Sequence, residues 1–265
     1  NKVYSVYGDR TGTIWVGTRD GLDRFDPKTG GFVHYKRDDK NPNSLSDSWV
    51  WPILEDRRGV LWFGTFGGGL NCFDRVTEKF TRFHHDEANS RSLCDDRLYS
   101  LYQDRSGMIW VGTINGIDCF NPEMGAFIHH FSDPKNPDGL IHNAVYSIHV
   151  DKLGIVWIAT EGGLDRWDRS TGKFTHYRHD PSKPNSLGVN QVQCILEDKS
   201  GSLWIGTRSS GLDRFDRASG KFVHFRHDPS NPKSLSEDRV FALLEDRRGE
   251  IWIGTYGGGL NRYDQ

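Results

Sequence analysis

Histidines and carboxylates are the residues of this chain that could act as acids, bases or metal ligands. The sequence holds 11 His and 36 Asp+Glu. Proton transfer in a lyase or hydrolase requires a histidine beside a carboxylate, and His142 with Glu161 or Asp95 is the best set available. A lyase or hydrolase is therefore one alternative for this chain, although we single out no residue as catalytic.

Most other histidines occupy two positions of a sequence repeat. These are His34, His129, His176 and His224 at one position, and His84, His85, His179 and His227 at the other. A closed metal site needs ligands that converge, whereas histidines on separate repeats lie apart. We expect structural or solvent-facing roles for them, and we predict no metal site and no cofactor.

An Asp-x-x-Gly pattern could be mistaken for a calcium loop. Its six aspartates are Asp9, Asp56, Asp104, Asp151, Asp198 and Asp246. Calcium takes six to eight oxygen ligands, so one carboxylate per turn is too few. Asp at the first position and Gly at the fourth is typical of a type I turn closed by a left-handed residue. The pattern predicts structural turns whose stability does not depend on calcium.

The four cysteines show no spacing that predicts a disulfide or a zinc site. Cys72, Cys94, Cys119 and Cys194 form no C-x-x-C motif. Cys72 and Cys119 replace an arginine at the same repeat position. We expect them to be thiols of the core or of a sheet face.

The repeat that contains these residues predicts the architecture. The phrase G-x-[I/L/V]-W-[V/F/I]-[G/A]-T occurs at Trp15, Trp62, Trp110, Trp157, Trp204 and Trp252, at intervals of 47 or 48 residues. That period fits one four-stranded propeller blade. In the fifth repeat we expect strand A at 192–197, strand B at 203–207, strand C at 212–216 and strand D at 221–226. The six tryptophans are predicted to be core residues.

We predict an all-β fold, a β-propeller of six four-stranded blades forming one domain, 1–265. The blades are expected near 3–36, 49–84, 97–131, 144–178, 191–226 and 239–265, and the last lacks its outermost strand. Three arrangements stay open: a six-bladed ring closed by face packing, part of a larger array, or self-association through the unpaired blade edge. Strands A and B are apolar on successive residues, which predicts burial on both faces, whereas strands C and D alternate.

Charge and hydropathy exclude several classes of protein. The formal net charge is −2, so no dominant basic face for nucleic acid is expected. No run of about 18 apolar residues and no signal peptide are present, so contact with a membrane would come only through segments of a parent protein. The chain begins with Asn1, and we expect it to be a piece of a longer protein.

The repeat carries a family resemblance over essentially the whole chain, with six matches in register, and two stretches show it clearly. The octapeptide WIATEGGL at 157–164 and the loop NPKSL at 231–235 resemble the two-component regulator propeller repeat. The resemblance implies a sensor module, the periplasmic or extracellular part of membrane sensor kinases, often responsive to carbohydrate. The kinase parts themselves are absent from this chain, and the family's typical ring has seven blades rather than six.

Loop positions that differ between otherwise similar repeats are where a ligand site can be tailored. The B–C and D–A loops should emerge on one face, around the mouth of the central channel. We call the following the rim residues: Arg19, Asp20, Trp49, Phe66, Arg97, Asn115, His142, Asn143, Glu161, Asn190, Gln191, Arg208, Asp238, Arg239 and Tyr256. Aromatic faces stack on sugar rings, and amides and carboxylates bind hydroxyls. The rim therefore predicts a small polar ligand or an oligosaccharide as partner; a protein-interaction scaffold is a further alternative.

Overall fold

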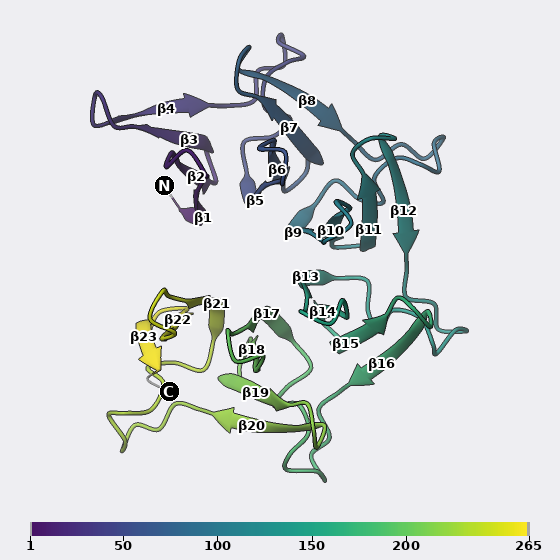
Figure 1. The fold of residues 1–265 in the computed structure, drawn as a ribbon, viewed down its shortest axis with the longest axis vertical. Coiled ribbons are helices and arrows are strands. Elements are labelled where there is room, and N and C mark those ends of the chain that lie inside the picture. Colours follow the sequence, from purple (N-terminus) through teal and green to yellow (C-terminus); the bar gives the residue numbers. More distant parts are fainter. Residues whose placement is uncertain (1, 264–265) are drawn as a thin grey trace. The chain divides into compact units, whose positions relative to one another are not determined.

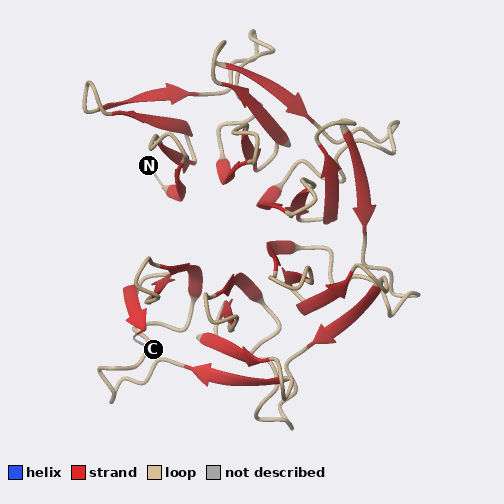
Figure 2. Ribbon diagram, in the orientation of Figure 1, coloured by secondary structure: helices blue, strands red, loops and turns tan. Residues whose placement is uncertain are grey.

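The computed structural model describes residues 2–263, and the chain divides between His130 and Phe131 into two compact units. Each unit consists of consecutive antiparallel sheets, which we call blades and number along the chain (Figure 1). Strands and loops account for all of the described residues (Figure 2), so none of them forms a helix long and apolar enough to cross a membrane.

Unit 1 holds blades 1 to 3. The strands of blade 1 are β1 (Val3–Gly8), β2 (Ile14–Thr18), β3 (Gly21–Asp26) and β4 (Gly31–Tyr35). Those of blade 2 are β5 (Val50–Glu55), β6 (Leu61–Thr65), β7 (Leu70–Asp74) and β8 (Lys79–Phe83). Those of blade 3 are β9 (Leu98–Gln103), β10 (Ile109–Thr113), β11 (Gly116–Asn121) and β12 (Ala126–His130). Within each blade the four strands pair in sequence order.

Unit 2 holds blades 4 to 6. Blade 4 consists of β13 (Val145–Val150), β14 (Val156–Thr160), β15 (Gly163–Asp168) and β16 (Lys173–Tyr177). Blade 5 consists of β17 (Val192–Glu197), β18 (Leu203–Thr207), β19 (Leu212–Asp216) and β20 (Lys221–Phe225). Blade 6 has three strands in the described part of the chain, β21 (Val240–Glu245), β22 (Ile251–Thr255) and β23 (Gly259–Tyr263). The predicted fold is confirmed: an all-β propeller of six blades, the last with three strands.

The Asp-x-x-Gly turn and the tryptophan after it form one structural device. In the turn after β1, Asp9 Oδ1 accepts hydrogen bonds from the amides of Thr11 and Thr13, both at 2.9 Å. Asp9 Oδ2 accepts the indole N–H of Trp15, also at 2.9 Å. Gly12 closes the turn with a φ of 83°, a conformation that glycine adopts without strain. The six-residue interval between Asp and Trp thus fixes the turn to the core, as the other five repeats also show.

Neighbouring blades of a unit pack through a buried aromatic and aliphatic seam. Between blades 1 and 2, Trp15 packs with Leu61, Phe63 and Phe73 in one buried cluster. Trp15 is 1% exposed, and burying such a side chain stabilises the fold by roughly 1.5–3 kcal/mol or more. Equivalent clusters join blades 2 and 3, 4 and 5, and 5 and 6. The structural role predicted for the tryptophans is confirmed.

Strand A does not have the two buried faces that the sequence predicted. Strands β6, β10, β14 and β18 are buried at every residue, whereas β1, β9 and β17 are mostly half-buried or exposed. In blade 3 the third strand, β11, is more buried than the first. The physical reason is that strand A is a sheet edge, with one neighbouring strand, so part of each side is open.

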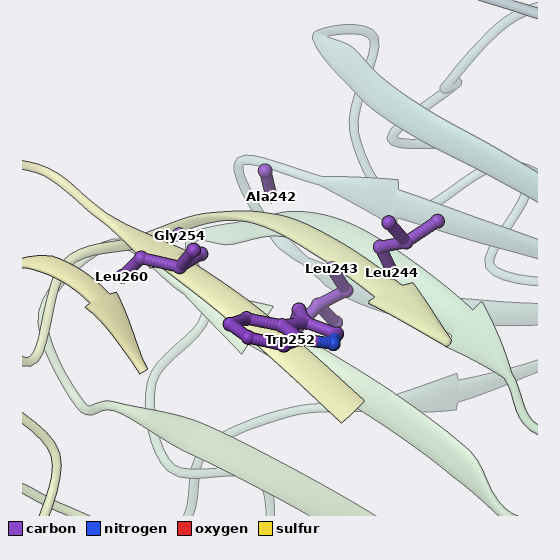
Figure 3. A pocket seen from close by; sticks show the side chains of 6 residues that line it. All are labelled: Ala242, Leu243, Leu244, Trp252, Gly254 and Leu260. Atoms are coloured by element: carbon purple, nitrogen blue, oxygen red, sulfur yellow. The ribbon is translucent and has the colours of Figure 1, made fainter. Parts of the chain in front are cut away.

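Within the described residues of unit 2, one face of blade 6 is not covered by another blade. In blade 5 the corresponding face, with Cys194, Leu196, Trp204 and Leu212, packs against blade 6. In blade 6 the same repeat positions line an open apolar cavity of about 280 Å³ (Figure 3). The lining residues are Ala242, Leu243, Leu244, Trp252, Gly254 and Leu260.

Candidate functional site

The two rim loops of each blade are held side by side by one backbone hydrogen bond. In blade 2 the amide of Phe66 donates to the carbonyl of Trp49 at 2.9 Å, and in blade 6 the amide of Tyr256 donates to the carbonyl of Arg239 at 2.8 Å. The other four blades make the equivalent bond. Within each blade, the B–C loop therefore emerges beside the residues that precede strand A, as the sequence predicted.

In unit 1 the rim residues Trp49 and Phe66 join an aromatic cluster. The ring centroids of Trp49 and Phe66 lie 4.6 Å apart. Tyr4 lies 4.8 Å from Trp51, and Tyr99 lies 5.1 Å from Trp51 and 5.5 Å from Phe66. We call these five rings the aromatic cluster. All five side chains are half-buried, so part of each ring faces solvent.

Three members of the aromatic cluster were missed by the sequence analysis. Tyr4, Trp51 and Tyr99 are each the second residue of strand A in β1, β5 and β9. The signal was available, because this position is aromatic in every repeat except the fifth, where Gln193 occupies it. Because the sequence predicts that strand A is buried on both faces, an aromatic residue at this position is interpreted as a core residue rather than as part of a site.

The arginines of the rim differ in their partners. Arg97 pairs with Asp95 at 2.7 Å, Arg208 faces Glu161 at 3.6 Å and Arg239 pairs with Glu237 at 3.2 Å. Arg19 instead lies over the ring of Trp49, with its guanidinium carbon 5.1 Å from the centroid. Asp20, next to Arg19, is paired with Lys36 at 2.7 Å.

In unit 2 the rim is more polar, and several of its side chains contact neighbouring side chains of the same unit. Glu161 accepts a hydrogen bond from the hydroxyl of Tyr146 at 2.7 Å. In blade 6 the guanidinium of Arg239 lies 4.9 Å from the centroid of Tyr256, which in turn lies 5.6 Å from Phe241. Tyr146 and Phe241 are again second residues of strand A.

Three rim residues have a structural hydrogen bond inside their own loop. The side-chain oxygens of Asn143, Asn190 and Asp238 accept the amides of Ser132, His179 and His227 at 2.6–2.7 Å. Each bond joins the two ends of a D–A loop. Gln191 takes part in the blade 5 loop bond through its carbonyl, and Asn115 lies exposed in blade 3. Contact of these residues with a ligand stays a prediction.

His142 has one hydrogen-bond partner among the described residues. Its Nδ1 accepts the amide of Ala144 at 3.1 Å. Glu161, the carboxylate proposed for it within the same unit, is engaged with Tyr146 and Arg208. The described geometry of unit 2 thus assembles no His142–Glu161 pair.

The histidines of strand D hold loops in place. In blade 4, His176 Nδ1 lies 2.6 Å from Asp165 Oδ1, and its Nε2 lies 2.9 Å from the carbonyl of Pro137. The carboxylate of Asp165 raises the pKa of His176, and burial raises the pKa of Asp165 itself. Equivalent His–Asp pairs occur at His34, His129 and His224. The structural role expected for these four residues agrees with this geometry.

Cys94, Asp118 and His129 lie close enough together to suggest a metal site. Their ligand atoms lie within 4.8 Å of one another. Both oxygens of Asp118 are already engaged, however, one with His129 Nδ1 at 2.6 Å and one with the amide of Cys94 at 2.9 Å. Burial raises the pKa of the Cys94 thiol, which opposes the thiolate that a metal would need. This cluster fits a structural role in blade 3.

The fold and these loops define a repeat-built β-propeller, and comparison with sequence families identifies which kind. The family model described as "Two component regulator propeller" matches six segments, 1–20, 44–67, 92–115, 139–162, 186–209 and 234–257. These segments make up more than half of the chain, which therefore belongs to the two-component regulator propeller family. No curated protein matches the chain in sequence.

Solved structures of similar fold include proteins of three kinds. The extracellular domain of the hybrid two component system BT3049 from B. thetaiotaomicron superposes with a TM-score of 0.76 at 24% identity over 99% of this chain. PorZ, a surface component of the type-IX secretion system of Porphyromonas gingivalis, gives 0.71 at 20% identity over 98%. Virginiamycin B lyase from Staphylococcus aureus gives 0.68 at 14% identity over 99% of this chain and 84% of the lyase. At these identities the likeness concerns the fold.

This chain spans 40% of the length of the BT3049 domain and 38% of PorZ.

Proposed function

We propose that this chain is the ligand-recognition module of an extracytoplasmic two-component sensor, and that it binds a carbohydrate or another polar ligand without chemistry of its own. Membership of the two-component regulator propeller family supports the sensor role. The extracellular domain of BT3049, which shares the fold, supports an extracytoplasmic location.

The aromatic cluster is the observation that carries this proposal. Five half-buried aromatic residues gather on unit 1, two from the rim loops and three from the first strands of blades, with Arg19 over the ring of Trp49. Stacking on aromatic faces is a common way to bind a sugar ring, and nearby polar groups fix its orientation.

Titration calorimetry of the chain against a panel of oligosaccharides tests the proposal. We expect heat of binding for at least one saccharide and a loss of affinity of tenfold or more in Trp51→Ala, since one stacking surface is removed. Phe32→Ala is the matched control, because Phe32 is an aromatic residue of unit 1 that is 49% exposed on β4, outside the rim. Absence of binding to every saccharide, or equal loss in both variants, would contradict the proposal.

A further inference from the structure

Arg19 is the one rim arginine without a carboxylate partner among the described residues. Arg97, Arg208 and Arg239 each face an acidic side chain. Arg19 is exposed and makes its described side-chain contact with the ring of Trp49, at 5.1 Å from the centroid. An arginine stacked on an indole uses its flat face, so the N–H groups along its edge stay free to bind another group.

Two acidic residues of the rim loops in unit 1, Asp20 and Asp95, are paired with other cations. Asp20 is paired with Lys36 at 2.7 Å, and Lys36 keeps the pKa of Asp20 below its usual value. Asp47, in the loop that carries Trp49, lies 3.9 Å from Arg37 and accepts the amide of Trp49 at 2.8 Å. Asp95, in the corresponding loop of blade 3, is paired with Arg97. Arg37 itself has a closer partner in Asp39, at 2.7 Å. None of these carboxylates pairs with Arg19 among the described contacts, so the guanidinium of Arg19 is free to bind a ligand anion at this edge of the aromatic cluster.

A free guanidinium beside open aromatic rings is complementary to a ring that carries an anionic group. The guanidinium edge matches a carboxylate with two parallel hydrogen bonds. The rings of Trp49 and Trp51 lie next to it, with their centroids 6.3 Å apart at an interplanar angle of 22°. A neutral sugar would use the rings and leave the charge of Arg19 without a partner.

The equivalent positions of unit 2 lack this combination. In blade 5 the second residue of strand A is Gln193, and Arg208 faces Glu161. In blade 6 Arg239 stacks on Tyr256 as Arg19 stacks on Trp49, but it is paired with Glu237. Among the described rim arginines, a guanidinium that stacks on a ring without a carboxylate partner is thus found only at the aromatic cluster of unit 1.

We propose that the aromatic cluster and Arg19 bind an acidic saccharide, one whose sugar ring carries a carboxylate, with the ring stacked on Trp49 and Trp51 and the carboxylate on Arg19. The inference rests on the proposed function and narrows its ligand class from carbohydrates in general to those that contain a uronic acid. Both hydrogen bonds to the carboxylate are charge-assisted, so the charge should increase the affinity about tenfold or more.

Calorimetry with charged and neutralised forms of the same saccharides tests this inference. The panel consists of oligomers of galacturonate, glucuronate and mannuronate, each measured beside its methyl ester, which keeps the ring and removes the charge, together with neutral oligosaccharides. We expect at least one uronate oligomer to bind about tenfold or more tightly than its ester. That preference should fall by about tenfold in Arg19→Gln and should weaken as salt is added.

Lys28→Gln is the matched control, because it removes one positive charge from the same blade, at an exposed turn beyond the opposite end of β3 from Arg19. Binding of saccharides with no preference for the carboxylate, or a preference that survives Arg19→Gln, would overturn the inference and leave the proposed function standing. Absence of binding to every saccharide, neutral or acidic, would overturn both.

Discussion

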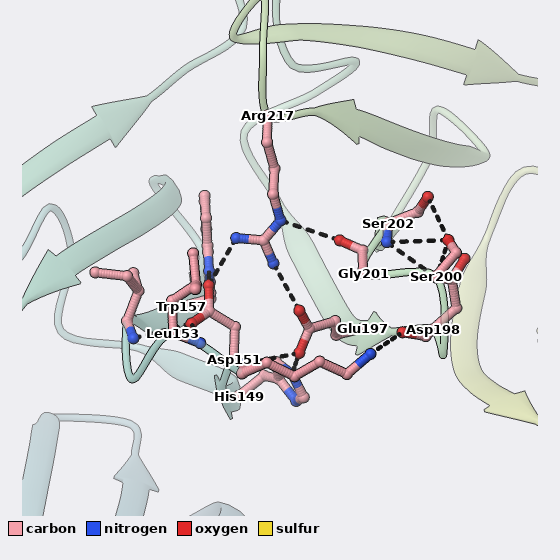
Figure 4. A network of polar contacts seen from close by, with 12 residues as sticks. His149, Asp151, Leu153, Trp157, Glu197, Asp198, Ser200, Gly201, Ser202 and Arg217 are labelled. Atoms are coloured by element: carbon pink, nitrogen blue, oxygen red, sulfur yellow. Dashed lines mark hydrogen bonds and ion pairs between the residues drawn. The ribbon is translucent and has the colours of Figure 1, made fainter.

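Arg217 joins two blades of unit 2 through one partly buried ion-pair network. Its guanidinium donates to Asp151 of blade 4 at 2.7 Å, to Glu197 of blade 5 at 3.0 Å and to the carbonyl of Gly201 at 3.0 Å (Figure 4). Asp151 also accepts the indole N–H of Trp157 at 2.9 Å. Burial would raise the pKa of Asp151, but the bonds from Trp157 and Arg217 outweigh it and hold the pKa below its usual value.

Arg217→Gln should lower the free energy of unfolding by about 2–3 kcal/mol, because the carboxylates of Asp151 and Glu197 are left buried without their cation. Urea denaturation measures the change. Lys183→Gln is the control: its pair with Asp180 is 3.0 Å long but the lysine side chain is 76% exposed, and such a pair contributes at most about 1 kcal/mol. Equal losses in the two variants would contradict the role assigned to Arg217.

His176 should make stability depend on pH. Its pKa in the folded chain is raised by Asp165, so its stabilising effect is fully present below pH 6.5, about the pKa in the unfolded chain, and is lost as the pH rises through the folded value. His176→Gln should therefore reduce the melting temperature more at pH 6 than at pH 8.

His149 should change the pH dependence of stability in the opposite direction. Burial lowers its pKa, and Glu197 opposes that effect only in part. The folded chain then loses stability as the pH falls through 6.5. His149→Gln should therefore lower the melting temperature less at pH 5.5 than at pH 8. The same pH trend in both histidine variants would contradict the environments described for the two side chains.

At the scale of the element, the tryptophan of strand B should stabilise a blade more when the next blade covers its side chain than when that side chain is partly exposed. Trp204 is 1% exposed and packs against blade 6. Trp252, at the same position of blade 6, lies on the face whose neighbours Leu244 and Leu260 are 62% and 66% exposed. Trp204→Ala should cost about 3–5 kcal/mol, and Trp252→Ala about half as much. Chemical denaturation of both variants checks this, and a larger loss for Trp252 would contradict the packing described.

The elements show clearly where prediction from the sequence succeeded. The 47- or 48-residue period and the Asp-x-x-Gly turns predicted the strand order and the turn geometry, because each repeat has the same local requirements. The spacing of Asp9 and Trp15 does not by itself reveal their hydrogen bond, since six residues separate them and only the turn brings them together. The network of Arg217 joins residues 20 and 66 positions away, which no local pattern indicates.

The candidate site was predicted only in part for a related reason. Repeat comparison found Trp49, Phe66 and Arg19, because loops vary while the scaffold does not. It missed Tyr4, Trp51 and Tyr99, whose apolar character in a strand resembles that of core residues. Strand A lies at the edge of its sheet, and this position decides how much of each side chain is buried. The sequence alone does not show which residues of an edge strand are exposed.

At the scale of the whole molecule, stability should not depend on a bound cation. In each turn the aspartate oxygens are engaged by amides and an indole N–H, as in Asp9 and Asp151. Adding a strong chelator should leave the melting temperature unchanged within about 1 °C, because no structural ion is lost. A fall of several degrees, reversed by calcium or zinc, would contradict this view of the turns and of the cluster around Cys94.

The central claim is that this propeller recognises its ligand where the repeats differ, through the aromatic cluster of unit 1. A crystal structure of the chain grown with the saccharide that binds most tightly tests it most directly. The account predicts density for a sugar ring stacked on Trp49 and Trp51, with an acidic group at Arg19. A saccharide bound only on the outer strands or the Asp-x-x-Gly turns, with the aromatic cluster empty, would contradict it.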